Sequence, residues 1–286
     1  MGVIIQERDF SPDQLAAFKK YQRLSYDVLE DAVSILKPGV SEIEAARHIR
    51  KLFHKAGARG YFHVPVVLFG DRTAYPGEFG QLEAISTERT LNDGDAVIFD
   101  AAPIFDGYKV DTSYAFSFGD NPAFDAADIA LEEFRSLLPT LIGKDLSFRE
   151  VAWKVDDRIK EIGFENCHKK HIGAVLGHRV TYAPQYPVRM PKVWGLAPRQ
   201  VSWFLYKSLQ ARLVSPEKTP NWNASRQCAS KPTDGLWAME PHIARDGVGV
   251  KFEEILVIDG DGVRWLDDDL PHVRRWRARQ LKGAAA

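Results

Sequence analysis

Residues 97–116, VIFDAAPIFDGYKVDTSYAF, decide how this chain folds. The apolar run before Asp100 indicates a buried strand over 96–100, and Asp106-Gly107 is a turn signal that returns the chain as an antiparallel strand over 108–118. This hairpin brings Asp100 and Asp111 together. Two carboxylates held close and away from water repel one another, and buried unpaired charge is costly. The alternative is that both are exposed hairpin charges, which fits poorly with Val-Ile-Phe before Asp100, so we predict a shared cation.

Helices and short strands are predicted on both sides of the hairpin. A helix begins at Ser11 and runs to about Leu36, and a capping-box sequence at Ser41–Glu44 opens a second helix that ends near Gly57. The remaining predicted elements are a strand over 61–69, helices over 122–141 and 147–162, and strands near 174–180, 236–241 and 252–258. No internal repeat is evident by eye. Such a mixture of helices and antiparallel hairpins predicts an α+β fold.

The segment over about 188–233 differs from the rest of the chain. It is rich in Pro, Trp and Arg, and it contains one predicted helix, over 198–213. Segments of this length inside a compact domain are usually functional or disordered, and the tryptophans argue against disorder. We expect this insertion either to cover the site or to form a dimer interface.

Further ionisable residues interrupt apolar strands. His178 lies in LGHRV, Glu240 in LWAMEPHI, and Glu253 and Glu254 in VKFEEILVI. A lone histidine in such a strand is more often a hydrogen-bonded core residue. Glutamates inside buried strands, however, are rare unless they are paired or metal-bound. Because side chains alternate between faces, only one of the two adjacent glutamates points inward. Together with the hairpin aspartates, they form an oxygen-rich set that suits a pair of Mn, Fe, Co or Zn ions.

The order of these residues resembles the metal signature of the pita-bread metallopeptidases, which include methionine aminopeptidase, Xaa-Pro aminopeptidase, prolidase and creatinase. DTSYAF is similar to the family's DTS-x-x-F, AMEPHI to its x-x-EP-x-I, and VKFEEILVI to its apolar-flanked glutamate. The resemblance spans about residues 15–260. It implies a single pita-bread catalytic domain over 1–286, without the N-terminal domain of prolidase and creatinase. The implied metal ligands are Asp100, Asp111, His178, Glu240 and Glu253.

The resemblance implies a hydrolase with two divalent ions (Mn, Co, Fe or Zn), which cleaves a peptide or related amide bond through a metal-bridging hydroxide. Glu240 would also shuttle a proton. The family's two accessory histidines are replaced here by Gly77 and Gln185. The replacement leaves two further hypotheses: creatinase-like, non-peptidase chemistry on a small amino-acid-like metabolite, and an inactive binding module.

Other side chains are candidates to take over from the accessory histidines. His63 could face the pocket from its strand, although a core or rim histidine is the alternative. Gln185, Tyr75 and Arg179 can donate hydrogen bonds. His171 and His242 lie near the motifs, but we do not expect them at the metals.

Composition limits the partners and the compartment. The formal net charge is −1, and the basic stretch over 272–282 reads as a solvated helix face, so no nucleic-acid partner is predicted. Two cysteines give no disulfide framework, which favours a reducing, cytoplasmic compartment. No apolar run approaches ~18 residues, so no membrane span is predicted. The family resemblance is consistent with a homodimer.

Overall fold

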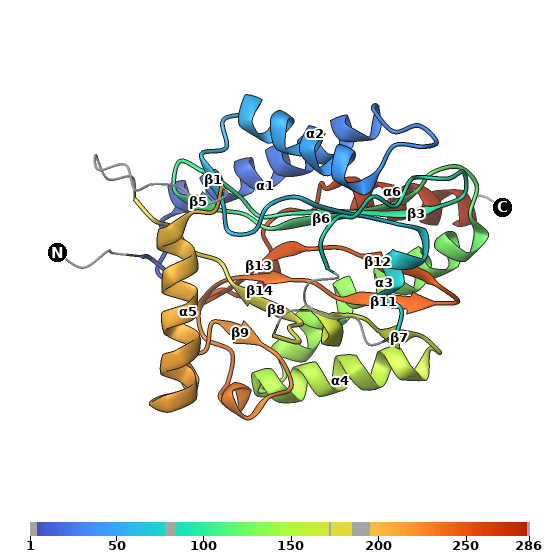
Figure 1. Cartoon of the computed structure of the whole chain (residues 1–286). Coiled ribbons are helices and arrows are strands. Elements are labelled where there is room, and N and C mark those ends of the chain that lie inside the picture. The colour runs from blue at the N-terminus through green and yellow to red at the C-terminus, as the bar shows by residue number, and fades with distance from the viewer. Residues whose placement is uncertain (1–4, 78–83, 172, 185–194, 285–286) are drawn as a thin grey trace.

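The structure is a computed structural model of the chain, and it describes residues 5–77, 84–171, 173–184 and 195–284. Curved antiparallel sheets form its centre (Figure 1). Helices α1 (Pro12–Val33) and α2 (Glu42–Lys55) lie along one side of the sheets, and α4 (Phe148–Glu161) lies along the other. Helix α5 (Pro198–Leu213) stands at one end of the molecule. This layered arrangement of helices on antiparallel sheets confirms the predicted α+β class.

The helices begin where the sequence predicts, because serine side chains cap them. Ser11, Ser41 and Ser147 each accept a hydrogen bond from the third helical backbone N–H, and the side chain at that third position accepts one from the serine backbone N–H. The first helix, α1, ends at Val33 rather than near Leu36, because residues 34–36 tighten into successive i→i−3 turns. The other long helices are α3 (Pro122–Ile142) and α6 (Pro271–Ala284).

The described strands form four small sheets in which every named pairing is antiparallel, with the orders β2-β3-β6, β1-β4-β5, β14-β13-β10-β8-β9 and β12-β11-β7. Their bounds are β1 Gly60–Tyr61, β2 Val66–Phe69, β3 Ala96–Ala101, β4 Pro103–Phe105, β5 Tyr108–Lys109, β6 Thr112–Ser117, β7 Glu165–Asn166, β8 Gly177–Arg179, β9 Asn221–Trp222, β10 Gly235–Met239, β11 His242–Arg245, β12 Val248–Lys251, β13 Glu254–Asp259 and β14 Gly262–Trp265.

Two segments repeat the same layout, which the sequence did not make evident. Residues 96–117 form β3 to β6, and residues 235–259 form β10 to β13. Each segment turns at an Asp-Gly pair with positive φ at both residues, at 106–107 and at 246–247. An isolated antiparallel bridge between Ser113 and Glu253 joins the two segments. The repeat escapes inspection because its two copies share little beyond the turn and the flanking charged residues.

Three predicted strands are broken. The strand predicted over 61–69 is interrupted at residues 62–65, where Pro65 has no N–H to donate to a ladder. The return strand predicted over 108–118 breaks at Val110–Asp111, so Asp100 pairs with Ser113 rather than with Asp111. The strand predicted from 252 begins only at 254. Asp111 and Glu253 therefore lie in gaps between strands, outside the regular ladders.

The sheets separate two hydrophobic clusters, and β3 shows how. Val97 and Phe99 belong to the cluster under α1 and α2, whereas Ala96 and Ile98 belong to the cluster under α3 and α4. This alternation is the period of two expected of a strand buried on both faces. Among the described residues, no helix is long and apolar enough to cross a membrane.

Candidate metal centre

The five side chains that the sequence analysis singled out lie near one another in the interior, two of them within strands and three in the segments directly beside strands. Asp100 lies in β3, Asp111 in the gap before β6, and His178 in β8. Glu240 follows β10 directly, and Glu253 precedes β13. Asp111 is fully buried and Glu253 is 1% exposed, so their charges require compensation from neighbouring groups.

One group of three ligand atoms has the geometry of a metal site. His178 Nε2 lies 3.1 Å from Asp111 Oδ2 and 3.3 Å from Glu253 Oε1. All three atoms lie within 4.8 Å of one another. Both carboxylate oxygens are buried, and neither has a hydrogen-bond partner in the part of the chain that the structure describes. Buried oxygens without a donor are rare in proteins, and a divalent ion bound between them would satisfy both. The residues present therefore fit a metal ion.

A second group is formed by His63, Asp100 and Asp111. His63 Nε2 lies 3.1 Å from Asp111 Oδ1 and 3.6 Å from Asp100 Oδ1. Its Nδ1 faces the Val64 carbonyl oxygen at 3.1 Å. His63 thus faces the carboxylates, as expected if it replaces an accessory histidine, and it contacts both aspartates of the first hairpin. Its catalytic role stays a prediction.

Lys251 is a central member of the cluster that the sequence analysis missed. Its Nζ lies 2.6 Å from Asp100 Oδ2, 2.8 Å from Glu240 Oε2 and 3.2 Å from Glu253 Oε2. The signal was present in VKFEEILVI, since residues 251 and 253 lie two apart in an extended segment and point to the same side.

The electrostatics of the cluster are those of crowded carboxylates. Burial, together with Asp111 and Glu240, raises the pKa of Glu253 to about 7. Burial also acts to raise the pKa of Asp111, but His63 and His178 outweigh it and hold that pKa well below its ordinary value. For Glu240, burial is likewise outweighed, here by Lys251 and His171, so its pKa is lowered. Neighbouring cationic groups thus favour the charged forms of Asp111 and Glu240, whereas burial and adjacent carboxylates favour the protonated form of Glu253.

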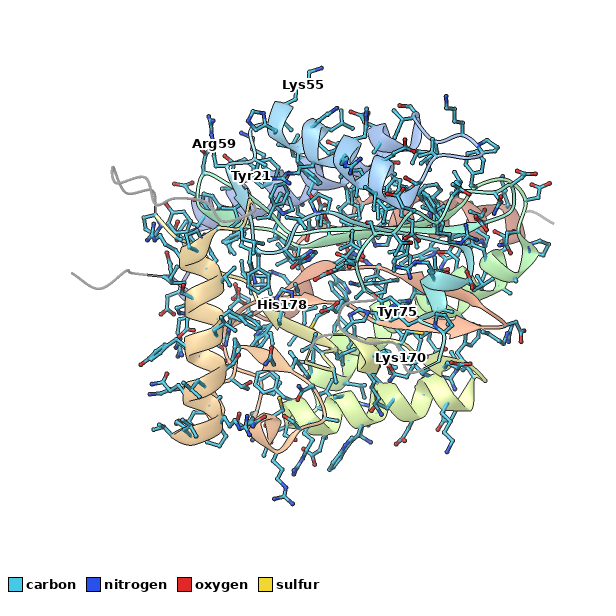
Figure 2. The ribbon with its side chains drawn as sticks, viewed as in Figure 1. Tyr21, Lys55, Arg59, Tyr75, Lys170 and His178 are labelled. Atoms are coloured by element: carbon cyan, nitrogen blue, oxygen red, sulfur yellow. The ribbon has the colours of Figure 1, made fainter. Side chains whose placement is uncertain are left out.

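Glu240 is also linked to two histidines that the sequence analysis did not place at the metals. His171 Nδ1 lies 2.9 Å from Glu240 Oε2, and its Nε2 lies 2.9 Å from His242 Nδ1. His242 Nε2 faces the Thr73 carbonyl oxygen at 2.7 Å. The Tyr75 ring packs edge-on against both imidazoles, and Figure 2 labels it in the interior beside the sheets. His171 thus brings an imidazole to the carboxylate cluster from the loop before β8.

A second buried lysine, Lys109, lies on the other side of His178. Its Nζ is 3.2 Å from His178 Nδ1 and 2.7 Å from the Arg179 carbonyl oxygen. It also lies 4.2 Å from the centroid of the Phe62 ring. Burial lowers the pKa of Lys109 to about 8. Phe62 in turn packs against Phe204 of α5, with ring centroids 5.1 Å apart, so the helix of the insertion covers this side of the cluster.

The other candidates lie elsewhere. Gly77 is exposed, and nothing lies within 4 Å of where its Cβ would be. Gln185 lies outside the described residues. Arg179 donates to Thr233 and to the Asp234 carbonyl and lies over the Trp237 ring, so its guanidinium is bonded to these residues and not to the carboxylate cluster.

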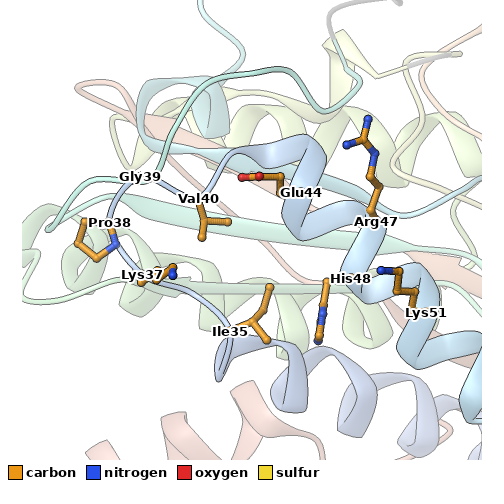
Figure 3. Close-up of a pocket in the computed structure, with 9 residues that line it drawn as sticks. All are labelled: Ile35, Lys37, Pro38, Gly39, Val40, Glu44, Arg47, His48 and Lys51. Carbon is orange, nitrogen blue, oxygen red and sulfur yellow. The ribbon is translucent and has the colours of Figure 1, made fainter.

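The surface hollow between α1 and α2 is separate from this chemistry. Figure 3 shows its lining, which includes Lys37, Glu44, Arg47, His48 and Lys51. None of its lining residues belongs to the carboxylate cluster. The buried cluster, and not this hollow, is therefore the candidate functional site.

The chain is similar in sequence and in fold to known peptidases. An uncharacterized peptidase of Staphylococcus aureus (strain USA300) is 27% identical over 169 residues, which cover 58% of this chain and 46% of the relative. The chain thus spans about half the length of the curated relatives it matches. The fold resembles that of an X-Pro aminopeptidase from Thermotoga maritima (TM-score 0.66, 17% identity, 93% of this chain and 64% of that chain). It also resembles a methionine aminopeptidase from Thermotoga maritima (TM-score 0.58, 14% identity, 92% and 99%).

These resemblances confirm the pita-bread fold that the motifs predicted. Residues 16–260 match the family description of metallopeptidase family M24, which covers most of the chain and contains every one of the five predicted ligands. The chain therefore belongs to metallopeptidase family M24.

Proposed function

We propose that this protein hydrolyses an amide bond in a peptide or a related small molecule, with a divalent ion held by Asp111, His178 and Glu253. The observation that carries the proposal is the pair of buried oxygens without hydrogen-bond partners, Asp111 Oδ2 and Glu253 Oε1, facing His178 Nε2. When bound, such an ion polarises a substrate carbonyl and lowers the pKa of a coordinated water. Asp100 and Glu240 complete the set of acidic groups around it.

The chain's own residues supply the proton chemistry in this proposal. Glu240 accepts a proton and returns it to the leaving amine, as the family resemblance implied. His171, in contact with Glu240 Oε2, orients that carboxylate and exchanges a proton with it. His242 and the Thr73 carbonyl hold the far side of the His171 ring in place. In this scheme His171 takes over part of the role that the resemblance assigns to the accessory histidines, which Gly77 and Gln185 replace in this sequence.

Two substrate classes are candidates for this site. The names of several similar structures, such as a prolidase from Thermococcus sibiricus (TM-score 0.63, 18% identity), favour peptides or dipeptides. The second candidate is a small amino-acid-like metabolite. Gly77 favours it, because no side chain extends from the position where the resemblance places an accessory histidine.

Four other expectations, among them the homodimer, also remain proposals. Leu205, Leu209 and Leu213 of α5 are between 55% and 70% exposed and follow one another at a helical spacing of four residues. This apolar stripe supports the homodimer that the resemblance suggested, because large exposed apolar patches mark interfaces. A dimer that uses this stripe should dissociate on L209K, as measured by sedimentation. A cytoplasmic location, the absence of a nucleic-acid partner and the single catalytic domain also stay predictions.

The activity is tested with metal-stripped protein reloaded with Mn or Co and offered Met-, Ala- and Xaa-Pro-initiated peptides. We expect turnover of at least one peptide class that is lost with the stripped protein and depressed about 100-fold or more in E240Q. Silence across the panel with metal bound would favour the metabolite substrate. Failure to bind metal at all would contradict the proposed hydrolase and favour the third hypothesis, an inactive binding module.

A further inference from the structure

Lys251 holds an unusual place for a lysine. Its side chain is 2% exposed, and its Nζ lies within 3.2 Å of an oxygen from each of Asp100, Glu240 and Glu253. An ammonium has three N–H donors, so these three carboxylates match its full donor capacity. Buried lysines are almost always paired, and here all three partners are predicted metal ligands.

The backbone requires this placement. Lys251 pairs with His242 in the ladder between β11 and β12, and it lies two residues before Glu253. Gly249 packs so closely on the Thr73 carbonyl that an added Cβ would lie 1.9 Å from that oxygen, which fixes β12 against the preceding segment. A residue at position 251 therefore faces the carboxylate cluster.

The contacts of Lys251 compete with a second metal ion. A dinuclear centre would need the Asp100 carboxylate and one oxygen of each bridging carboxylate for that ion. Asp100 Oδ2 and Glu253 Oε2 are instead in contact with the lysine ammonium. Two oxygens near His178 have no hydrogen-bond partner among the described residues: Asp111 Oδ2 and Glu253 Oε1. Together with His178 Nε2 they form one metal position.

The other place for a second ion is the group of His63, Asp100 and Asp111. Asp100 Oδ1 has no hydrogen-bond partner there, so the position has a free oxygen ligand. An ion bound to Asp100 Oδ1 would share one carboxylate with the ammonium on Oδ2 and would be repelled by it at short range. Removal of the ammonium would relieve this repulsion and free the remaining oxygens.

We propose that the ammonium of Lys251 takes the place of a second metal ion, so that the centre binds one divalent ion, between Asp111, His178 and Glu253. The inference rests on the proposed function, since it presumes that the first position binds metal. Lys109 does not enter this competition, because its ammonium contacts His178 and the Arg179 carbonyl oxygen and none of the three carboxylates that Lys251 holds.

The test is the number of Mn ions bound per chain, measured by equilibrium dialysis and elemental analysis at saturating Mn. We expect one equivalent for the wild type, one for K251R, which keeps a cation, and two for K251M. The matched control is K109M, since Lys109 is equally buried and holds the equivalent place in the other hairpin; its count should stay at one. Electron paramagnetic resonance should show isolated Mn(II) in the wild type and a spin-coupled pair in K251M.

Each outcome decides between the two proposals. Two equivalents in the wild type overturn the role of Lys251 and leave the proposed hydrolase intact. No bound metal in the wild type overturns both. One equivalent in folded K251M shows that the lysine does not exclude the second ion, and it overturns the inference. Should K251M fail to fold by circular dichroism, the wild-type count and K251Q still decide the question.

Discussion

Lys109 and Lys251 hold equivalent positions in the two repeated hairpins, each two residues before a carboxylate of the cluster. Lys109 precedes Asp111 and contacts His178, whereas Lys251 precedes Glu253 and contacts three carboxylates. The same backbone layout thus places one ammonium beside the imidazole of His178 and the other among the carboxylates of the cluster. The difference follows from what lies opposite each lysine, since β8 faces the first and Glu240 the second.

Asp111 belongs to both candidate ligand groups, so its loss should be the most damaging single change. We expect Asp111→Ala to lower bound metal below detection and activity by more than about 100-fold, because ligand changes cost more than changes in supporting residues. Elemental analysis and peptide hydrolysis measure the two effects. Asp157→Ala, at an exposed site on α4, is the control. An Asp111→Ala protein that keeps its metal contradicts the assignment.

His171 should act on turnover without controlling metal uptake. Its imidazole contacts Glu240 but is not one of the predicted ligands. We expect His171→Gln to lower kcat about 10- to 100-fold with the metal content and the KM nearly unchanged.

His168 is the matched control for this test. It is a buried histidine three residues earlier that contacts Asp156 instead of Glu240. His168→Gln should lower the melting temperature while it leaves kcat in place. Equal kcat losses in both variants would point to a general loss of structure.

Asp128 should make stability depend on acid pH. It is fully buried on α3 and pairs with Arg275 and Arg279 of α6. Burial acts to raise its pKa, but the two guanidinium groups outweigh burial and lower it. A lowered folded pKa stabilises the protein above the unfolded value of about 3.9, and the stabilisation is lost as pH falls through the folded value.

Asp128→Asn should therefore cost about 3 kcal/mol in unfolding free energy at pH 7, with a smaller difference from wild type near pH 3. Urea unfolding at both pH values measures it. Asp125→Asn, on the exposed side of the same helix, should change stability by less than about 0.5 kcal/mol. A deficit in Asp128→Asn that is constant with pH would contradict the charge pairing.

Gly249 should tolerate no side chain, because a Cβ would lie 1.9 Å from the Thr73 carbonyl oxygen. We expect Gly249→Ala to destabilise the protein by about 3 kcal/mol through displacement of β12. Since β12 carries Lys251 and leads to Glu253, metal binding should weaken as well. Gly260→Ala, with nothing within 4 Å of its Cβ, is the control. Thermal unfolding distinguishes the two, and equal melting temperatures would disprove the steric account.

The sequence predicted the helices well because their signals are local. Serine caps fixed the starts of α1, α2 and α4, and α5 has the bounds that were predicted for it, Pro198–Leu213. The strands were predicted less well, because an apolar run does not reveal where a ladder breaks. The breaks at Val110–Asp111 and before Glu254 depend on how the two hairpins pack together, which involves residues far apart in the chain.

The same reasoning explains what was found and missed at the site. The five predicted ligands were recognisable because charged residues in apolar strands are rare and their order resembled a known family. Lys251 was overlooked because a lysine beside a strand end is ordinarily an exposed residue. His171 was set aside because its distance from Glu240 depends on a loop whose path no local pattern specifies.

The spacing of the ligands along the chain also limits when the centre can form during synthesis. Asp100 and Glu253 belong to the two hairpin segments 96–117 and 235–259, which lie far apart in the chain, and the Ser113–Glu253 bridge forms only when both are present. A nascent chain still lacking β12 and β13 would carry acidic groups without the ammonium of Lys251 or the last ligand. The proposed centre is therefore complete only once the chain has been synthesised through Glu253, and a truncated chain that ends before β12 should bind no metal there.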